Sequence, residues 1–232
     1  MFLDNIEKKR SERLKVIENH EKNGVVFVDE FTAYIDESVT IGEGTVIGPC
    51  VTLSGNTRIG KNCVIGQNSV IKDSYIDDNV DIQSSVITES SVGSGTKVGP
   101  FAYMRPDSHV GKDCKVGDFV EVKNSTLGDG TKASHLTYIG DSDVGAGVNL
   151  GCGVVFVNYD GTKKYRSVVE DNAFIGCNSN LVSPVRVGEG AYIAAGSTVT
   201  EDVNGDSLYI ARTKGTEKPG WVSSKGILKR KK

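Results

Sequence analysis

His135 is the residue whose type and setting most strongly suggest chemistry in this 232-residue chain. It stands in the segment SHLTY at residues 134–138, about one turn of the predicted scaffold before a polar loop. An isolated histidine is most often structural, but an imidazole titrates near neutral pH and can remove a proton from a substrate there. Because His135 follows the apolar residue Ala133 by two positions, we expect its side chain at the surface or at a corner, as a candidate general base.

The polar loop NYDGTKK that follows is the second candidate for function. Asn, Asp and Gly favour a turn, so an ordinary surface loop is one interpretation. The other is a binding loop, because the amide of Asn158, the phenol of Tyr159 and the ammonium of Lys164 suit a sugar phosphate. Arg105 and Lys123 each follow a repeat-leading apolar residue by one position. They are either solvated surface cations or a phosphate clamp, and their spacing does not decide between the two.

A six-residue period supplies the scaffold that must position these groups. Apolar residues return every six positions, with small and turn-forming residues between them, and the period resumes after the loop. This is neither the 3.6-residue period of a helix nor the alternation of a simple hairpin. It predicts an all-β fold, a parallel β-helix of short strands with about 18 residues per coil and about nine coils over residues 34–203. The first uninterrupted run consists of Ile35, Ile41, Ile47, Leu53, Ile59, Ile65 and Ile71.

The chain divides into three parts. Residues 1–24 carry a loose apolar stripe that includes Leu14 and Ile17, which is typical of an amphipathic helix or linker. Residues 25–203 hold the repeats, which form the β-helix domain. Residues 204–232 form an irregular, basic tail that is either disordered or packs on a neighbouring subunit.

Composition excludes several classes of protein. The net charge of -3 does not favour a nucleic-acid partner, and no apolar run is long enough to cross a membrane. The amino terminus has no signal-peptide core, so we expect a cytoplasmic protein. Five cysteines without a CxxC pair are expected to be buried free thiols. Only two of the three histidines fall within the repeats, so neither a three-histidine zinc site nor any other catalytic metal is expected.

Three motifs carry a closer resemblance than the period alone. The segments HLTY at residues 135–138, NYDG at 158–161 and the alanine-rich AYIAAGSTVT at 191–200 are the most specific of them. With GPFAYMRP and the linker-like helix, they resemble the carboxyl-terminal half of the family of bifunctional glucosamine-1-phosphate acetyltransferase / N-acetylglucosamine-1-phosphate uridyltransferases (GlmU), within the hexapeptide-repeat acyltransferases. This resemblance implies a left-handed β-helix and a homotrimer with sites in the clefts between subunits. It also implies acetyl-CoA as co-substrate.

The resemblance implies a function and a role for each matching residue. The expected reaction is N-acetylation of glucosamine 1-phosphate by direct attack on acetyl-CoA, toward UDP-N-acetylglucosamine and the cell wall. His135 matches the general base, and Glu121 is expected to orient its imidazole. The residues that match sugar-phosphate binders are Arg105, Lys123, Tyr138, Asn149 and Lys164. The residues that match the acetyl-CoA site are Cys152, Asn158, Tyr159, Cys177, Ala195 and Arg212.

Two departures from the family pattern leave alternatives open. Cys177 stands where the family commonly has serine, which weakens any role for a hydroxyl there. The sequence shows no uridyltransferase domain, so the chain is either a stand-alone acetyltransferase, with uridyl transfer left to a separate protein, or a piece of a longer enzyme. One alternative is therefore a non-catalytic trimeric scaffold that serves a partner. Another is an acetyltransferase for a different amino sugar, although Arg105 and Lys123 favour a phosphorylated acceptor.

Overall fold

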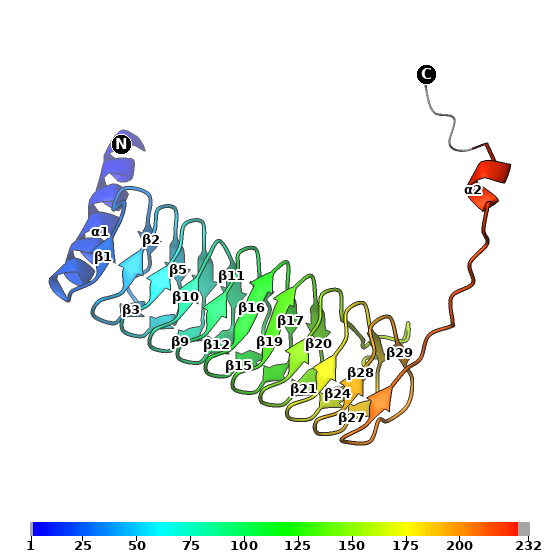
Figure 1. Ribbon diagram of the computed structural model, residues 1–232. Coiled ribbons are helices and arrows are strands. Elements are labelled where there is room, and N and C mark those ends of the chain that lie inside the picture. The colour runs from blue at the N-terminus through cyan, green and yellow to red at the C-terminus, as the bar shows by residue number, and fades with distance from the viewer. Residues whose placement is uncertain (1, 227–232) are drawn as a thin grey trace.

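The chain forms a parallel β-helix whose coils stack along one axis (Figure 1). The computed structural model describes residues 2–226. Met1 and residues 227–232, the end of the predicted tail, lie outside the described residues. Three parallel sheets of eleven, ten and nine strands make up the stack. The predicted left-handed β-helix of hexapeptide repeats is confirmed, with about ten coils instead of nine.

The strands are short, and each one pairs with the strand one coil away. The first sheet contains β1 (Val26–Phe27), β4 (Val46–Ile47), β7 (Val64–Ile65), β10 (Asp81–Ile82), β13 (Lys97–Val98), β16 (Lys115–Asp118), β19 (Lys132–His135), β22 (Asn149–Leu150), β25 (Phe174–Ile175), β28 (Tyr192–Ile193) and β30 (Leu208–Tyr209). The second sheet contains β2 (Tyr34–Ile35), β5 (Thr52–Ser54), β8 (Val70–Lys72), β11 (Val86–Thr88), β14 (Tyr103–Met104), β17 (Glu121–Lys123), β20 (Tyr138–Gly140), β23 (Val155–Val157), β26 (Asn180–Val182) and β29 (Thr198–Val199). The third sheet contains β3 (Thr40–Ile41), β6 (Arg58–Ile59), β9 (Tyr75–Ile76), β12 (Ser90–Val92), β15 (Ser108–Val110), β18 (Thr126–Leu127), β21 (Ser142–Val144), β24 (Ser167–Val169) and β27 (Arg186–Val187).

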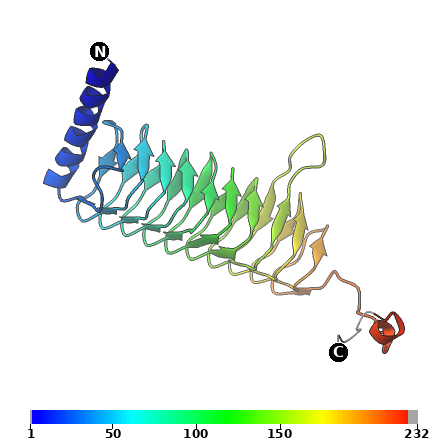
Figure 2. The ribbon, with the colours of Figure 1, turned by 90° about the horizontal axis from the view of Figure 1, so that it is seen from above.

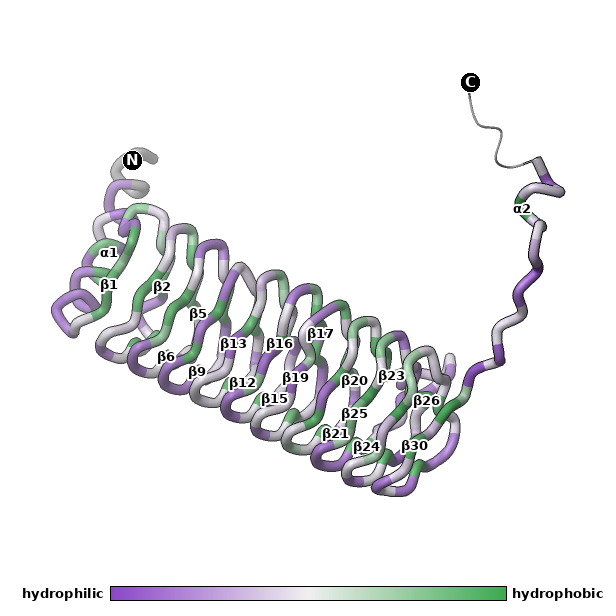
Figure 3. The backbone as a smooth tube through the Cα atoms, in the orientation of Figure 1, coloured by the Kyte–Doolittle hydropathy of each residue, from purple (hydrophilic) through white to green (hydrophobic). Residues whose placement is uncertain are grey.

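The repeat-leading residues form the core. Because side chains alternate along a strand, one residue of each short strand points inward and its neighbour outward. Ile47, Leu53 and Ile65 are fully buried, as is Phe156 next to the polar loop. Apolar positions recur on every coil of the stack (Figure 3). The six-residue period therefore reflects one continuous core, in which each coil packs on its two neighbours.

The expectation that all five cysteines are buried is wrong. Only Cys63 and Cys114 are buried, and burial raises the pKa of both thiols, which donate hydrogen bonds to backbone carbonyls. Cys50 and Cys177 are exposed and Cys152 is half-buried, because these three lie in turns rather than at inward positions. All five are free thiols.

A helix covers the open end of the stack. This helix, α1 (Phe2–Lys22), buries Ile17, whose side chain is 1% exposed, against the first coils. Arg13 donates hydrogen bonds from its guanidinium to the backbone oxygens of Phe31 and Ala33, and the guanidinium lies 4.6 Å from the centre of the Tyr34 ring. The helix thereby supplies hydrogen-bond donors to backbone carbonyl groups at the amino-terminal end of the stack, where the described chain has no further coil to pair with them.

The other end of the chain leaves the stack after β30 and extends away from its own coils (Figure 1). It ends in a single turn, α2 (Trp221–Ser224), which has no buried residue. No helix within residues 2–226 is long and apolar enough to cross a membrane.

We call the turns that connect β13, β16, β19, β22, β25 and β28 to the second sheet the first edge. At this edge Gly117 allows β16 and β19 to approach closely. A Cβ atom added at Gly117 would lie 1.9 Å from the backbone oxygen of Ser134. The two strands would therefore have to separate where His135 is held.

Replacing Gly117 with alanine should therefore destabilise the β-helix. Overpacking a core typically costs about 1–3 kcal/mol, and each kcal/mol lowers Tm by roughly 2–4 °C in a domain of this size. The matched control is Gly215→Ala, because an added Cβ there meets nothing within 4 Å. Thermal unfolding followed by circular dichroism would contradict this account if the Tm of Gly117→Ala equalled that of the control.

Candidate functional site

His135 and Asp118 form a contact at the first edge. They end β19 and β16, and the two residues pair in register across those strands. The Nδ1 atom of His135 lies 2.5 Å from Oδ1 of Asp118. Because a carboxylate only accepts, the imidazole Nδ1–H is the donor. This hydrogen bond lowers the pKa of Asp118, while the His135 side chain remains 54% exposed.

Glu121 is not the carboxylate that contacts His135, contrary to our expectation. It begins β17 in the second sheet, and its Oε1 atom accepts a hydrogen bond of 2.8 Å from Nη1 of Arg105. The reason is the coil length. Asp118 precedes His135 by 17 residues, close to one coil, and so lies directly beside it. Glu121 precedes His135 by less than a coil and falls on the next face.

Three cations gather at the far side of the second sheet. Arg105 follows β14, and its backbone N–H bonds to the neighbouring strand beside Lys123. The amine of Lys164 reaches the ammonium of Lys123, which lowers the pKa of Lys164. The same contact raises the pKa of Lys123, and the carboxylate of Asp141 adds to this effect. We call Arg105, Lys123 and Lys164 the cationic cluster.

Asp141 connects the cationic cluster to the polar loop. It is 6% exposed, and its carboxylate lies 3.3 Å from Nζ of Lys123. It also accepts hydrogen bonds from the side-chain amides of Asn124, at 2.6 Å, and Asn158, at 2.5 Å. Burial raises the pKa of Asp141, but these hydrogen bonds and the Lys123 charge outweigh burial, and the net shift is downward. The Asn158 amide also contacts the hydroxyl of Tyr138 at 3.4 Å.

Sequence reasoning missed both Asp118 and Asp141. The signal that identifies them is the coil length, because residues about one coil apart are stacked neighbours. Asp141 lies 18 residues after Lys123 and 17 before Asn158. A search for polar residues one coil from each candidate would have found both carboxylates.

Asp160 organises the polar loop internally. Its Oδ1 atom accepts hydrogen bonds from the backbone and hydroxyl of Thr162 and from the backbone of Lys163, and its Oδ2 atom accepts one from the hydroxyl of Tyr165. The bonds from Lys163 and Thr162 strongly lower the pKa of Asp160. Figure 2 shows the loop projecting beyond the coils. Tyr159 and Lys164 face each other as an isolated antiparallel pair, so Lys164 leaves the loop in a defined position.

Arg166 anchors the end of the polar loop to the coils of the β-helix. Its guanidinium donates to both carboxylate oxygens of Asp143 and, at 2.9 Å, to the backbone oxygen of Asn124. These bonds lower the pKa of Asp143. The loop is therefore held at its start by Asp141 and at its end by Asp143.

Four of the six expected acetyl-CoA residues form a column along the first edge, whereas Asn158 and Tyr159 lie in the polar loop. Asn178 N–H donates to the backbone oxygen of Cys152, and Gly196 N–H donates to that of Cys177, each at 2.8 Å. These bonds stack Cys152, Cys177 and Ala195 on successive coils beyond His135. The guanidinium of Arg212 bonds to the backbone oxygen of Ala195 at 2.7 Å and extends the column.

Asn149 is the exception among the expected sugar-phosphate residues. It lies on the first sheet in β22, between Lys132 and Phe174 of the neighbouring strands. The cationic cluster follows the second sheet, so one chain does not bring Asn149 to it.

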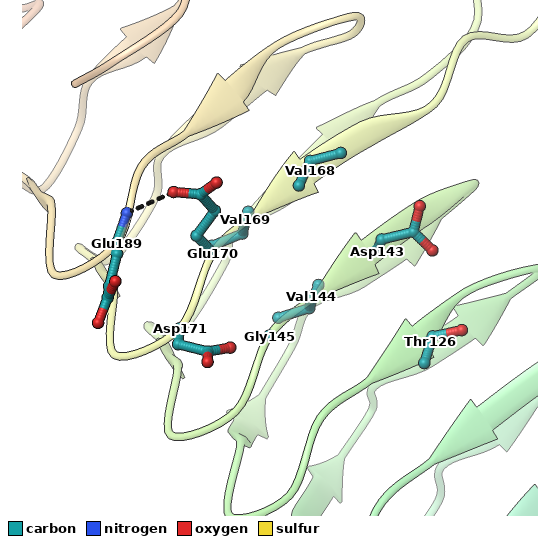
Figure 4. Close-up of a pocket in the computed structure, with 9 residues that line it drawn as sticks. All are labelled: Thr126, Asp143, Val144, Gly145, Val168, Val169, Glu170, Asp171 and Glu189. Atoms are coloured by element: carbon teal, nitrogen blue, oxygen red, sulfur yellow. Dashed lines mark hydrogen bonds between the residues drawn. The ribbon is translucent and has the colours of Figure 1, made fainter. Parts of the chain in front are cut away.

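The third sheet carries a hollow of about 460 Å³ that contains none of the expected residues (Figure 4). Its walls are acidic, but Asp143 is paired with Arg166 and Glu170 with Arg186. Glu189 donates its backbone N–H to the same Glu170 side chain. Within residues 2–226, no three His, Cys, Asp or Glu side chains are placed to hold a metal ion.

Comparison with known proteins gives consistent matches. A family model described as "Bacterial transferase hexapeptide (six repeats)" matches residues 38–73, 89–124 and 166–201. The "Bifunctional protein GlmU" of Caldicellulosiruptor saccharolyticus is 52% identical over 210 residues, which are 90% of this chain and 45% of that protein. The protein of the same name from Acetivibrio thermocellus is 53% identical over 220 residues, which are 95% of this chain and 48% of that protein.

Among solved structures, the Arabidopsis UDP-N-acetylglucosamine acyltransferase aligns with a TM-score of 0.50 at 18% identity, over 89% of this chain and 77% of that one. At that identity the likeness supports the fold alone. The sequence matches support the family assignment as well as the fold. The chain spans about half the length of the curated relatives it matches. The chain therefore belongs to the hexapeptide-repeat transferases and, within them, is a relative of the GlmU proteins.

Proposed function

We propose that this chain transfers the acetyl group of acetyl-CoA to the amine of glucosamine 1-phosphate. The observation that carries the proposal is the grouping of His135, the cationic cluster and the Asn158 loop around the second sheet. This reaction needs a histidine base, a phosphate-binding group and an amide in one region. About half of the residues are identical to those of GlmU proteins, which supports the same assignment.

The cationic cluster is the proposed phosphate site. Three cations close together repel one another, and a bound phosphate reverses that cost by bonding to each of them. Asp141 keeps Lys123 charged, and Glu121 holds Arg105. We therefore assign Glu121 to the phosphate site rather than to the base. We assign Tyr138, whose hydroxyl contacts the Asn158 amide, to the sugar, and Asn158 to the space between the sugar and the thioester.

The proposed mechanism is direct transfer without an acyl-enzyme. The amine nitrogen attacks the thioester carbonyl carbon, and Nε2 of His135 takes the proton that the nitrogen loses. The C–S bond then breaks, and the coenzyme thiolate leaves and takes that proton. We assign a backbone N–H near Cys152 to stabilise the negative charge that develops on the carbonyl oxygen. Cys177, Ala195 and Arg212 are assigned to the coenzyme along the first edge, and Tyr159 is assigned to it from the polar loop.

We also propose that the active form is a homotrimer. The tail leaves its own coils with Trp221 47% exposed, and Asn149 lies across the first edge from the cationic cluster. A neighbouring copy would bring such segments together in a cleft between two chains. The product, N-acetylglucosamine 1-phosphate, would be the substrate of a uridyltransferase that acts outside the segment described here.

Removing the proposed base should abolish most turnover. We expect His135→Ala to lower kcat by roughly 10²–10⁴-fold, the usual contribution of a general base. The measurement is thiol release from acetyl-CoA with glucosamine 1-phosphate, compared with glucosamine and glucosamine 6-phosphate. His109→Ala is the matched control, because His109 lies on the third sheet and contacts Ser91. Undiminished turnover in His135→Ala, or no turnover in the wild-type chain, would refute the proposal.

Truncating the cationic cluster should weaken binding of the sugar phosphate. Lys164→Ala leaves the Lys123–Asp141 pair in place and removes one charge-assisted bond, which is worth about 1.5–3 kcal/mol, or roughly 10- to 100-fold in Kd. Lys132→Ala is the control, because Lys132 is an exposed lysine on the first sheet. Calorimetry with glucosamine 1-phosphate should show the loss only for Lys164→Ala. Equal affinities would remove this residue from the site.

The lowered pKa of Lys164 predicts a pH dependence of binding. A phosphate dianion favours the charged amine, so binding should take up a proton and weaken as pH rises through the lowered pKa of Lys164. Below that pKa the affinity should be constant, provided pH stays above about 7, where the phosphate is fully charged. Lys164→Arg remains charged and should bind with the same affinity across pH 7 to 10. A Kd that is independent of pH in the wild-type chain would contradict this account.

A further inference from the structure

Two strands at the first edge are longer than the others. β16 and β19 each have four residues, whereas the other strands of the described chain have two or three. The added residues carry the pairing as far as Asp118 and His135. Leu136 N–H also donates to the backbone oxygen of Asp118 at 2.9 Å, just beyond the extended pairing. Backbone and side-chain bonds thus hold the same two residues together.

Gly117 is the second part of this arrangement. Its position leaves no room for a Cβ atom beside the backbone of Ser134, the residue before His135. The close approach of the two strands therefore requires glycine at the position that precedes Asp118. The Asp118 side chain is 36% exposed and the His135 side chain 54% exposed, and polar pairs that remain in contact with water add little to stability, so the contact has no evident purpose in folding.

We propose that Asp118 is a positioning residue for His135. It accepts the Nδ1–H of the imidazole, fixes the orientation of the ring and keeps the proton on Nδ1. The Nε2 atom is then left without a proton and with its lone pair available to the acceptor amine. This inference rests on the proposed acetyl transfer, in which His135 is the base, but its structural part can be tested without activity.

Other charged groups do not take this role. Glu121 bonds to Arg105, and Asp141 bonds to Lys123 and two amides. Lys115 lies in the same strand as Asp118, and its charge is a minor contribution to the lowered pKa of Asp118. Asp118 is the carboxylate that touches the imidazole.

Steady-state kinetics provide the first test. We expect Asp118→Ala to lower kcat by roughly 10- to 100-fold, less than the 10²–10⁴-fold contribution of the base itself. The KM values for acetyl-CoA and the sugar phosphate should not change, and neither should Tm. Asp118→Asn keeps an acceptor oxygen and should recover part of the loss. Asp81→Ala is the control, because Asp81 is a carboxylate of the same sheet that contacts Gln83 instead.

A double variant distinguishes an effect of Asp118 that acts through His135 from one that is independent of His135. If Asp118 acts through the imidazole, Asp118→Ala should cause no further loss in a His135→Ala background. An independent, additive loss there would overturn the inference. Full kcat in Asp118→Ala alone would overturn it as well.

Nuclear magnetic resonance provides a readout besides activity. The chain has three histidines, so long-range ¹H–¹⁵N spectra can resolve each ring. Wild-type His135 should show the Nδ1-protonated tautomer, and Asp118→Ala should shift it toward the Nε2-protonated form that an unconstrained imidazole prefers. His109 is the internal reference and should not change.

The two tests distinguish failure of this inference from failure of the proposed function. A chain that acetylates no amino sugar but shows the Nδ1 tautomer, lost in Asp118→Ala, would refute the function and retain the positioning. A chain that is active and whose His135 tautomer ignores Asp118→Ala would refute the positioning and retain the function.

Discussion

The in-register stacking of successive coils is the constraint on which the site depends. Parallel strands place a residue beside the one a coil away, so two side chains distant in sequence become direct neighbours. Asp118 meets His135 in this way, and Asp141 meets both Lys123 and Asn158. The buried repeat-leading residues keep this register, because a slip of one residue would turn them out to solvent. The core therefore determines which polar groups can meet on the surface.

The charged groups of the candidate site have defined electrostatic partners, and Lys164 differs from them. Asp118 faces His135, Glu121 faces Arg105 and Asp141 faces Lys123. The two more exposed pairs contribute little to folding but hold long side chains in one place, whereas Asp141 is buried and its charge needs the Lys123 partner. Lys164 is the exception, because the described residues give it no ion pair and its nearest charged neighbour is another lysine. A repulsion of this kind is tolerable where an anionic ligand is expected to relieve it.

Sequence alone predicted the β-helix, because the six-residue period depends only on which side chains face the core. It also placed His135, the loop and the cationic cluster near one another through motif resemblance. It did not predict Asp118 or Asp141, and it assigned Glu121 to the wrong partner. Those errors share one physical cause: contacts between coils depend on the local coil length, which is 17 residues at Asp118 and 18 at Lys123. The period gives the average coil and not the local one.

The polar loop shows how a site can be added to such a scaffold without disturbing it. Across the loop-bearing coil the stacked pair Ala146 and Asp171 is 25 residues apart, yet the next strands resume their register. Phe156 and Val169, on either side of the loop, are both buried. Closing a loop a few residues longer costs little, since the entropy varies with the logarithm of length. Ordering it on ligand binding would cost more, about 1–2 kcal/mol for each residue that is fixed. The hydrogen bonds to Asp160 order the loop in advance, so a ligand at Lys164 does not have to offset that cost.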